Sequence, residues 1–316
     1  MNLRSINSEI RAAGAFYKAV SPLGYEGVQR AVGPLSTKAM SVLSLKHLNC
    51  EKVNITRNDG TPMRTCIMKS HKRDGKTVGI LWLHGGGYSL GAPEMAIMTL
   101  PRYLIRNCSC VVISPDYTLS TVKPYPAALN DAFTALQWVK AHKKELGITA
   151  DKIVVGGESA GGGLTAALCL YARDKGEDCI GFQIPLYPML DDRVTATSAN
   201  NSAPVWGTKE NKSAWHIYLG DRVMNNSVEP YAAPARATDL KGLPPAFSMI
   251  GTADPFYEET VDFFERMKQN GVECELTEYG GCFHAFDMMV PFAPISKRAS
   301  LSLLDKYNEY CKKYIL

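Results

Sequence analysis

The segment Gly157–Gly161, with the sequence GESAG, matches the pattern G-x-S-x-G. An apolar run typical of a buried strand, residues 153–156, precedes it, and a helical pattern follows it. A serine on such a tight strand-to-helix turn needs glycines on both sides, because a Cβ there would clash with neighbouring elements. The pattern predicts that Ser159 is a nucleophile for acyl transfer. The competing interpretation is a glycine-rich turn with an incidental serine.

A second glycine-rich segment, His84–Gly87 (the oxyanion loop below), follows the apolar run 79–83. Consecutive glycines at a strand end let backbone N–H groups face a cavity, and acyl transfer needs such donors about 3 Å from the oxyanion. We therefore expect the N–H groups of Gly86, Gly87 and Ala160 to form an oxyanion hole. A phosphate-binding loop is disfavoured, because neither G-x-G-x-x-G nor GK[ST] follows. His84 itself is expected to shape the loop rather than to carry a proton.

A serine hydroxyl needs a nearby base at neutral pH. Among the six histidines, His284 alone lies in a loop after a late predicted strand, downstream of Ser159 and of an acid. The others precede the sheet, lie in a charged helical run, belong to the oxyanion loop or fall in an irregular region: His47, His71, His84, His142 and His216. We expect His284 to be the general base.

The acid that orients His284 is predicted at the end of the apolar run 246–251. Asp254 follows that run and precedes Pro255. A carboxylate in this place can fix the imidazole tautomer and stabilise the imidazolium. Its competing role is a helix N-cap, which is compatible with the first. Glu258 is the nearest rival and is given a supporting role.

Apolar runs alternate with helical patterns along most of the chain. The predicted strands are 53–58, 63–69, 78–83, 110–115, 153–156, 180–186, 246–251 and 274–278, and the predicted helices are 127–144, 160–175, 258–269 and 295–314. The first two strands flank a turn signal at Asp59-Gly60 and are expected to form an antiparallel hairpin. The remaining alternation predicts an α/β fold with a mostly parallel sheet and helices on both faces.

Two regions depart from the alternation. Residues 1–49 are predicted as helix, break (21–24) and helix; Ile6, Ile10, Ala13, Tyr17 and Val20 give the first helix its apolar face. Residues 191–230, the cap segment, open with polar residues and contain a predicted short helix around Trp215. We expect both to cover the carboxyl ends of the strands as a small helical cap, where open α/β sheets bind ligands. The core would comprise 50–190 and 231–316.

The composition excludes several classes of protein. The 316 residues carry 35 Lys and Arg against 31 Asp and Glu, a net charge of +4 with no basic block longer than a pair. We therefore expect no nucleic-acid or membrane partner, and no stretch approaches the ~18 apolar residues of a membrane span. The nine cysteines include no CxxC pair. They, and the lack of a signal-like N-terminus, predict reduced thiols in a cytoplasmic protein.

Together these motifs resemble the hormone-sensitive-lipase-like family of α/β-hydrolases. The oxyanion loop matches the family's HGGG, and residues 157–162 resemble its GDSAGG, with Glu158 in place of Asp. Asp116-Tyr117 with 125–128, the segment 251–255 and the segment 284–286 resemble three further family motifs. Thr118 replaces the usual arginine, Ser120-Thr121-Val122 replaces Ala-Pro-Glu, and Ala285 replaces the glycine after the histidine. The first two departures affect local salt bridging, and the third is a small change.

The resemblance implies a serine carboxylesterase, a carboxylic ester hydrolase acting on a small-molecule ester with a short acyl group, acetyl to butyryl. No metal or organic cofactor is implied, and a homodimer is left open. The residues expected near the substrate are His84, Tyr88, Met189, Leu190, Trp206 and Trp215. Ordinary packing of the cap on the core is the other interpretation of its tryptophans.

Three alternatives remain at this point. A carbohydrate O-acetyl esterase would use Asn200, Asn201 and Ser202 for sugar contacts. A non-catalytic ligand-binding homologue would use the same pocket without turnover. A lipase acting at lipid interfaces is disfavoured by the polar residues 195–202.

Overall fold

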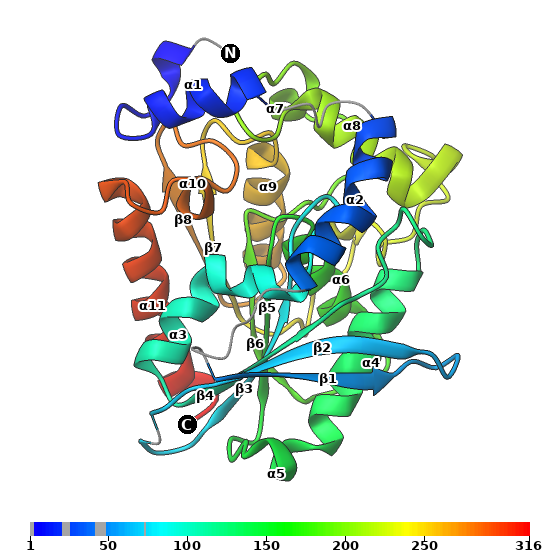
Figure 1. The fold of residues 1–316 in the computed structure, drawn as a ribbon, viewed down its shortest axis with the longest axis vertical. Helices are drawn as coiled ribbons and strands as arrows, with labels where there is room; N and C mark the ends of the chain where they lie inside the picture. Colours follow the sequence, from blue (N-terminus) through cyan, green and yellow to red (C-terminus); the bar gives the residue numbers. More distant parts are fainter. Residues whose placement is uncertain (1–2, 21–25, 42–48, 73) are drawn as a thin grey trace.

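The computed structural model describes residues 3–20, 26–41, 49–72 and 74–316 (Figure 1). Its centre is an eight-stranded sheet with the order β1-β2-β4-β3-β5-β6-β7-β8. The strands are β1 Cys50–Thr56, β2 Pro62–Lys69, β3 Val78–Leu83, β4 Cys110–Pro115, β5 Ile153–Glu158, β6 Ile180–Leu186, β7 Ala246–Gly251 and β8 Cys274–Tyr279. All eight were predicted from the sequence, with ends that differ by no more than a few residues.

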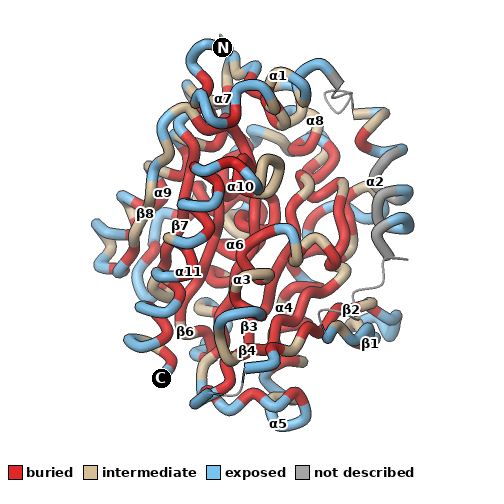
Figure 2. The backbone as a smooth tube through the Cα atoms, turned by 60° about the vertical axis from the view of Figure 1, so that its left-hand side comes forward, coloured by how far each residue is buried: buried red, intermediate tan, exposed pale blue. Residues whose placement is uncertain are grey.

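Pairing in the sheet is antiparallel at one edge and parallel elsewhere. Strand β2 pairs antiparallel with both β1 and β4, and all pairs from β4-β3 to β7-β8 are parallel. The β1–β2 hairpin closes where it was predicted, with Gly60 at a φ of +84° and the N–H of Thr61 bonded to Oδ1 of Asp59 at 3.0 Å. Strands β3, β4, β5 and β7 are buried along their whole length, as expected for strands covered on both faces (Figure 2).

Helices pack on both faces of this sheet. Helices α4 and α6 contact each other and strand β3, whereas α3 and α11 contact each other and cover the other face. The longer helices are α1 Arg11–Val20, α2 Glu26–Ser41, α3 Leu100–Asn107, α4 Ala127–Ala141, α6 Ala160–Asp174, α8 Thr208–Leu219, α9 Tyr257–Gln269 and α11 Pro294–Tyr314. The short ones are α5 Lys143–Leu146, α7 Ala196–Ala199, α10 Phe286–Met289, η1 Leu3–Ser5, η3 Pro93–Met98, η4 Gly220–Arg222 and η5 Pro234–Arg236. The fold predicted from the alternation, including its helical layers, is confirmed.

Two helix predictions differ from the structure in their bounds, and two further segments were missed. The continuous helix expected to residue 144 ends at Ala141, because His142 leaves the helical conformation, and α5 then stops at Gly147 with a φ of +74°. The first helix begins only at Arg11, because Asn7 bonds instead to the backbone of Gly280 and Gly281. Segments η3 and α3 were not predicted. The break expected at 21–24 lies outside the described residues.

The N-terminal helices and the cap segment lie over the carboxyl ends of the strands (Figure 1). Helix α2 contacts α8 of the cap segment, with Nε2 of Gln29 bonded to the carbonyl of Glu210 at 3.3 Å. Nδ1 of His216 lies 2.7 Å from a carboxylate oxygen of Glu26. These contacts connect α2 to the cap segment, and the division into a cap, formed by 1–49 and 191–230, and a core stays a prediction.

Candidate active site

Ser159 lies on the turn between β5 and α6, with a φ of +58° and a ψ of −120°. This region of backbone space is unfavourable for a residue with a side chain. Both flanking positions require glycine for steric reasons. A Cβ on Gly157 would lie 2.3 Å from the carbonyl oxygen of Leu83, and a Cβ on Gly161 would lie 2.0 Å from the same oxygen. The G-x-S-x-G pattern therefore lets the turn pack directly against the end of β3.

The structure brings Ser159, His284 and Asp254 together. Oγ of Ser159 lies 2.8 Å from Nε2 of His284, and Nδ1 of His284 lies 2.7 Å from Oδ2 of Asp254. All three side chains are buried. With the Nδ1 proton donated to the Asp254 carboxylate, Nε2 is left to accept the hydroxyl proton of Ser159. Such an arrangement is what a nucleophilic serine requires.

Asp254 is not the N-cap of α9, because that position is occupied by Phe256 and has no side-chain cap bond. Oδ1 of Asp254 instead accepts the N–H of Phe256 at 2.9 Å, in the turn that leads into the helix. Glu258 does not join the pair. Its exposed carboxylate accepts the N–H groups of Ala196 and Thr197, at 2.5 and 3.3 Å, and connects α9 to α7 of the cap segment.

The His284 ring is held between aromatic rings. The rings of Tyr187 and Phe256 lie edge-on to the imidazole, with centroids 5.2 and 5.0 Å from its centroid and interplanar angles of 81° and 87°. Trp206 of the cap segment lies 6.2 Å away. The next residue, Ala285, has a φ of +55°, a left-handed conformation that explains why the resembled family has glycine there.

The oxyanion loop approaches Ser159 with an unusual backbone. Gly86 and Gly87 have φ values of +115° and +58°. A Cβ on Gly86 would lie 2.4 Å from the carbonyl oxygen of Leu90. That same turn is closed by N–H bonds from Ser89 and Leu90 to the carbonyl of Gly86, at 3.1 and 2.9 Å. Ala160 begins α6, where an N–H group has no intrahelical acceptor. The assignment of these three N–H groups as oxyanion donors stays a proposal.

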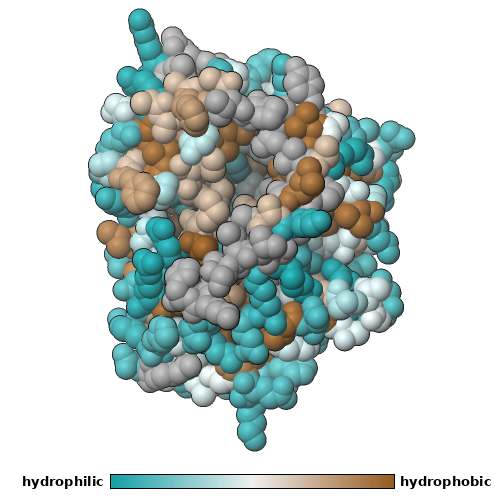
Figure 3. All heavy atoms as spheres, in the orientation of Figure 1, coloured by the Kyte–Doolittle hydropathy of each residue, from teal (hydrophilic) through white to brown (hydrophobic). Residues whose placement is uncertain are grey.

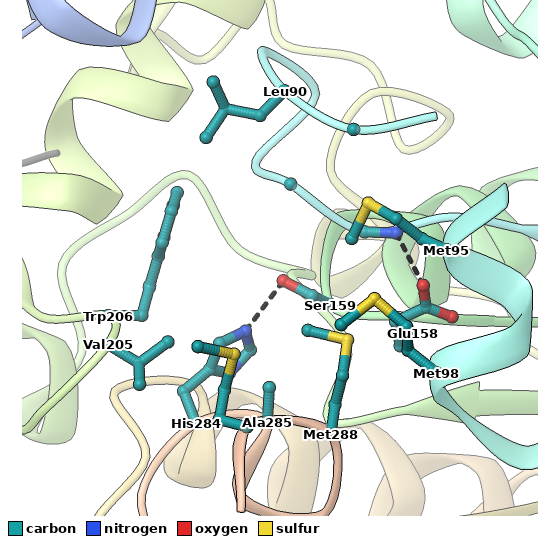
Figure 4. A pocket seen from close by; sticks show the side chains of 14 residues that line it. Leu90, Met95, Met98, Glu158, Ser159, Val205, Trp206, His284, Ala285 and Met288 are labelled. Atoms are coloured by element: carbon teal, nitrogen blue, oxygen red, sulfur yellow. Dashed lines mark hydrogen bonds between the residues drawn. The ribbon is translucent and has the colours of Figure 1, made fainter. Parts of the chain in front are cut away.

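A pocket of about 360 Å³ opens in front of Ser159 (Figure 4). Its walls are almost entirely apolar. They consist of Gly85, Gly86, Leu90, Gly91, Met95, Met98, Glu158, Ser159, Val205, Trp206, His284, Ala285, Met288 and Met289. Val205 and Trp206 lie on one side of Ser159 in Figure 4, and Met95, Met98 and Met288 lie on the other. Figure 3 shows one face of the molecule, on which apolar side chains gather in the upper half, whereas the lower part is mostly hydrophilic.

Of the six residues expected near the substrate, only Trp206 lines this pocket. Met189 and Leu190 are fully buried behind Ser159, where the N–H of Met189 bonds to the Ser159 carbonyl at 3.0 Å and the N–H of Leu190 bonds to Glu259 at 2.7 Å. Tyr88 stacks on Tyr218 of α8 with centroids 3.9 Å apart. These three residues therefore do not line the pocket: Met189 and Leu190 bond within the core, and Tyr88 packs α8 onto it. Their contact with the substrate stays a prediction.

His84 and Trp215 also lie away from the pocket walls. Trp215 is buried beside Tyr88 and Tyr218. The His84 ring stacks on Tyr117 with centroids 4.2 Å apart, and its Nδ1 lies 2.8 Å from the carbonyl of Gly85. Burial lowers the pKa of His84 to about 4, so this imidazole is neutral at pH 7. Its expected role in shaping the loop agrees with these contacts.

The methionines of the pocket were missed by the sequence analysis. Met95 and Met98 come from η3, which was not predicted, and Met288 and Met289 come from α10, just after His284. The available signal was the proximity of the last pair to His284 in the chain. Among the described residues, no cluster of three His, Cys, Asp or Glu side chains could hold a metal ion.

Comparison with known proteins agrees with this geometry. A model of the α/β-hydrolase fold family matches residues 80–288. A carboxylesterase of Mycobacterium tuberculosis, NlhH, is 33% identical over 236 residues, covering 72% of this chain and 73% of its own. An esterase of the same organism, LipI, is 30% identical over 223 residues, covering 70% and 69%. The solved structure of a bacterial heroin esterase superposes with a TM-score of 0.84 at 30% identity, covering 96% and 98%.

The chain belongs to the α/β-hydrolase family, and within it to the esterases that resemble hormone-sensitive lipase. It is a carboxylic ester hydrolase, the class that its named relatives share. In the part of the chain that the structure describes, every helix is too short or too polar to cross a bilayer.

Proposed function

We propose that the chain is a serine carboxylesterase that hydrolyses short-acyl esters, acetyl to butyryl, through an acyl-enzyme. The observation that carries the proposal is the continuous series of hydrogen bonds from Asp254 through His284 to Ser159, at the floor of an apolar pocket. The almost entirely apolar lining of the pocket suits an uncharged small-molecule ester.

The mechanism has two steps. Oγ of Ser159 attacks the ester carbonyl while Nε2 of His284 takes its proton, and the N–H groups of Gly86, Gly87 and Ala160 stabilise the oxyanion. His284 then protonates the departing alcohol, which leaves an acyl group on Ser159. Water deprotonated by His284 attacks this acyl-enzyme in the same way and releases the acid. Asp254 keeps the imidazole oriented throughout and stabilises its charged form.

The preference for short acyl groups is argued from Trp206. Its indole lies beside Ser159 and against Gly87, where a Cβ would be 2.5 Å from the ring. This ring closes the wall of the pocket next to the oxyanion loop, so an acyl chain directed toward it has little room. A series of p-nitrophenyl esters from acetate to dodecanoate tests this: kcat/KM should be highest between two and four carbons, and a maximum at long chains would overturn the preference.

Deacetylation of a carbohydrate receives no support from the cap segment. The side chain of Asn201 is used internally, with its amide N–H groups bonded to the carbonyls of Thr197 and Ala253 and its oxygen accepting the N–H of Ala203. Neither Asn200 nor Ser202 contributes to the pocket walls. An apolar wall cannot supply the hydrogen bonds that bound hydroxyl groups require.

The decisive experiment combines labelling and mutation. A fluorophosphonate should label Ser159 covalently in the wild type and should not label the Ser159→Ala variant. That variant should lose p-nitrophenyl acetate turnover by about 10⁴-fold or more, as removal of a nucleophile does in serine hydrolases. Unlabelled wild-type protein would support the non-catalytic alternative, and near-normal turnover by Ser159→Ala would identify a different nucleophile.

A further inference from the structure

A buried carboxyl group lies between the proposed nucleophile and the oxyanion loop. Glu158 directly precedes Ser159, is 1% exposed, and lines the pocket. Its Oε1 accepts the backbone N–H of Gly85 at 3.0 Å, and its Oε2 accepts the indole N–H of Trp82 at 2.7 Å. The mechanism above assigns this group no step, yet it touches the loop that carries two of the proposed oxyanion donors.

The indole of Trp82 reaches this carboxyl across the sheet. Trp82 on β3 stands opposite Gly156 on β5 in the parallel register. A Cβ on Gly156 would lie 2.5 Å from the Trp82 ring, so the indole lies flat over a position that only glycine can occupy. The donor from β3 and the acceptor at the end of β5 are thereby fixed relative to each other.

Gly85 is held equally closely. A Cβ on Gly85 would lie 2.9 Å from the carbonyl oxygen of Glu158 and 3.2 Å from Cβ of Ser159. The backbone of the oxyanion loop therefore rests on the nucleophile turn, and the hydrogen bond from Gly85 N–H to Glu158 fixes its orientation. This bond orients the His84–Gly85 peptide, and the N–H of Gly86 lies one peptide unit further along the loop.

We propose that Glu158 is a positioning residue that holds the oxyanion loop in register with Ser159, through its paired hydrogen bonds to Gly85 and Trp82. This proposal rests on the proposed function of the same site. Donors preorganised around a developing oxyanion lose their effect when they are misplaced by a fraction of an ångström. Glu158 therefore acts on the rate of the chemical step and not on substrate binding.

The protonation state of Glu158 follows from its surroundings. Burial raises its pKa to about 8, although the bonds from Gly85 and Trp82 favour the charged form. The titratable groups around it are Asp287 of α10, Tyr117 after β4 and Tyr187 after β6, and His284 lines the same pocket. The Asp287 carboxylate further raises the Glu158 pKa.

A pH effect on catalysis results. Ionisation of Glu158 as the pH rises through about 8 places a negative charge beside the oxyanion. This charge repels the charge that develops on the substrate, so kcat should fall, and we expect Glu158 to contribute an alkaline limb to the pH profile of the wild type.

Two substitutions of Glu158 separate positioning from charge. Glu158→Leu removes both acceptors and should lower kcat by about 10-fold or more with KM within about two-fold, less than the roughly 10² to 10³ of deleting an oxyanion donor. A trifluoromethyl ketone, which binds Ser159 as a tetrahedral adduct, should bind more weakly by a similar factor. Glu158→Gln keeps one acceptor and cannot ionise, so it should retain more of kcat and lose the alkaline limb.

The substitution Trp82→Phe should shift the alkaline limb rather than abolish it. It removes a donor that favours the carboxylate, so the Glu158 pKa should rise and the alkaline limb should move to higher pH. Trp138→Phe, on the half-buried outer side of α4, is the matched control and should leave the limb in place. Glu259→Gln is the control for loss of a buried carboxyl group: its carboxylate accepts two backbone N–H groups, from Leu190 and Asp191, outside the pocket walls.

The outcomes are distinct. The positioning role is overturned if Glu158→Leu keeps kcat within two-fold. The assignment of the alkaline limb to Glu158 is overturned if Glu158→Gln retains the limb or if Glu259→Gln loses it as well. Failure of the proposed function has a separate signature, since the wild type would then not be labelled by a fluorophosphonate. Thermal unfolding of every variant shows whether a lost rate reflects lost structure.

Discussion

The indole of Trp206 in the cap segment lies directly against the backbone of Gly87 in the oxyanion loop. A Cβ on Gly87 would lie 2.5 Å from Cη2 of that ring and 2.9 Å from Cζ2. The same ring lines the pocket beside Ser159 and lies 6.2 Å from the His284 ring. One side chain from the cap therefore contacts the loop that is proposed to bind the oxyanion and shapes the space left for the substrate.

A methyl group at Gly87 is expected to lower activity for two separable reasons. Alanine at a φ of +58° is strained by about 1 kcal/mol, and its Cβ would overlap the Trp206 ring. We expect Gly87→Ala to lower kcat/KM for p-nitrophenyl acetate by about 10²-fold, comparable to losing one oxyanion donor.

The double variant Gly87→Ala/Trp206→Ala tests the contact itself. It removes the overlap and leaves the backbone strain, so part of the lost activity should return. If the effects of the two substitutions simply add, the ring and the loop are not coupled in the way the structure indicates.

Trp206→Ala alone should change acyl selectivity. Removing the indole opens the wall next to the oxyanion loop, and each methylene that then finds an apolar contact is worth about 1–3 kcal/mol. The ratio of kcat/KM for p-nitrophenyl octanoate to that for the acetate should therefore rise by about 10-fold or more. Trp215→Phe, which alters a buried ring of α8 outside the pocket walls, should leave this ratio unchanged.

The sheet and the three polar side chains of the site were predictable because each has a local signal. The strand 110–115, for example, is buried throughout. Ser159 is flanked by glycines and the oxyanion loop contains them, and at these positions a Cβ would clash with neighbouring atoms. Asp254 and His284 could be selected because each follows a predicted strand. Parallel strands end at the same edge of the sheet, which brings these two side chains close to each other.

The walls of the pocket were not predictable in the same way. Trp206 precedes α8 and Trp215 lies on it, so which of them faces the pocket depends on how the cap segment packs on the core. Both tryptophans have the same hydrophobic signal in the sequence. Segment η3, which carries Met95 and Met98, has the length of a turn, and its position is set by ion pairs from Glu94 to Lys52 and Arg64 of the distant β1–β2 hairpin. Such contacts between remote segments leave no periodic pattern.

His84 should make the protein sensitive to acid. The unfolded chain binds a proton at this residue near pH 6.5, whereas burial lowers its pKa in the folded protein to about 4. As the pH falls through this range, the unfolded state gains protons first, so the free energy of unfolding falls by up to about 3 kcal/mol. Urea unfolding between pH 7 and pH 4 should show this loss in the wild type.

Replacement of His84 by phenylalanine should remove that slope. Phenylalanine keeps the stacking on Tyr117 and cannot titrate, so the wild type should lose more stability than His84→Phe between pH 6.5 and pH 4. His142, a half-buried histidine stacked on Trp138 with centroids 4.5 Å apart, gives the matched control. A His142→Phe variant that flattens the pH dependence as much as His84→Phe does would contradict this explanation.

Ala285 should be improved by glycine. Its φ of +55° places a Cβ in the left-handed region, at a strain of about 1 kcal/mol that glycine does not experience. Glycine also has the greater freedom in the unfolded chain, so the net gain is smaller, and Ala285→Gly should raise the free energy of unfolding by a few tenths to about 1 kcal/mol.

Ala237→Gly is the control of opposite sign: Ala237 is buried at a φ of −64° and a ψ of 129°, and glycine there should lower stability by about 0.4–1 kcal/mol. Thermal unfolding measures both, and equal destabilisation by the two substitutions would show that the backbone at 285 is not strained. Because Ala285 adjoins His284, kcat of Ala285→Gly should also be measured; a value within about two-fold of the wild type is expected, since aromatic rings rather than this Cβ hold the imidazole in place.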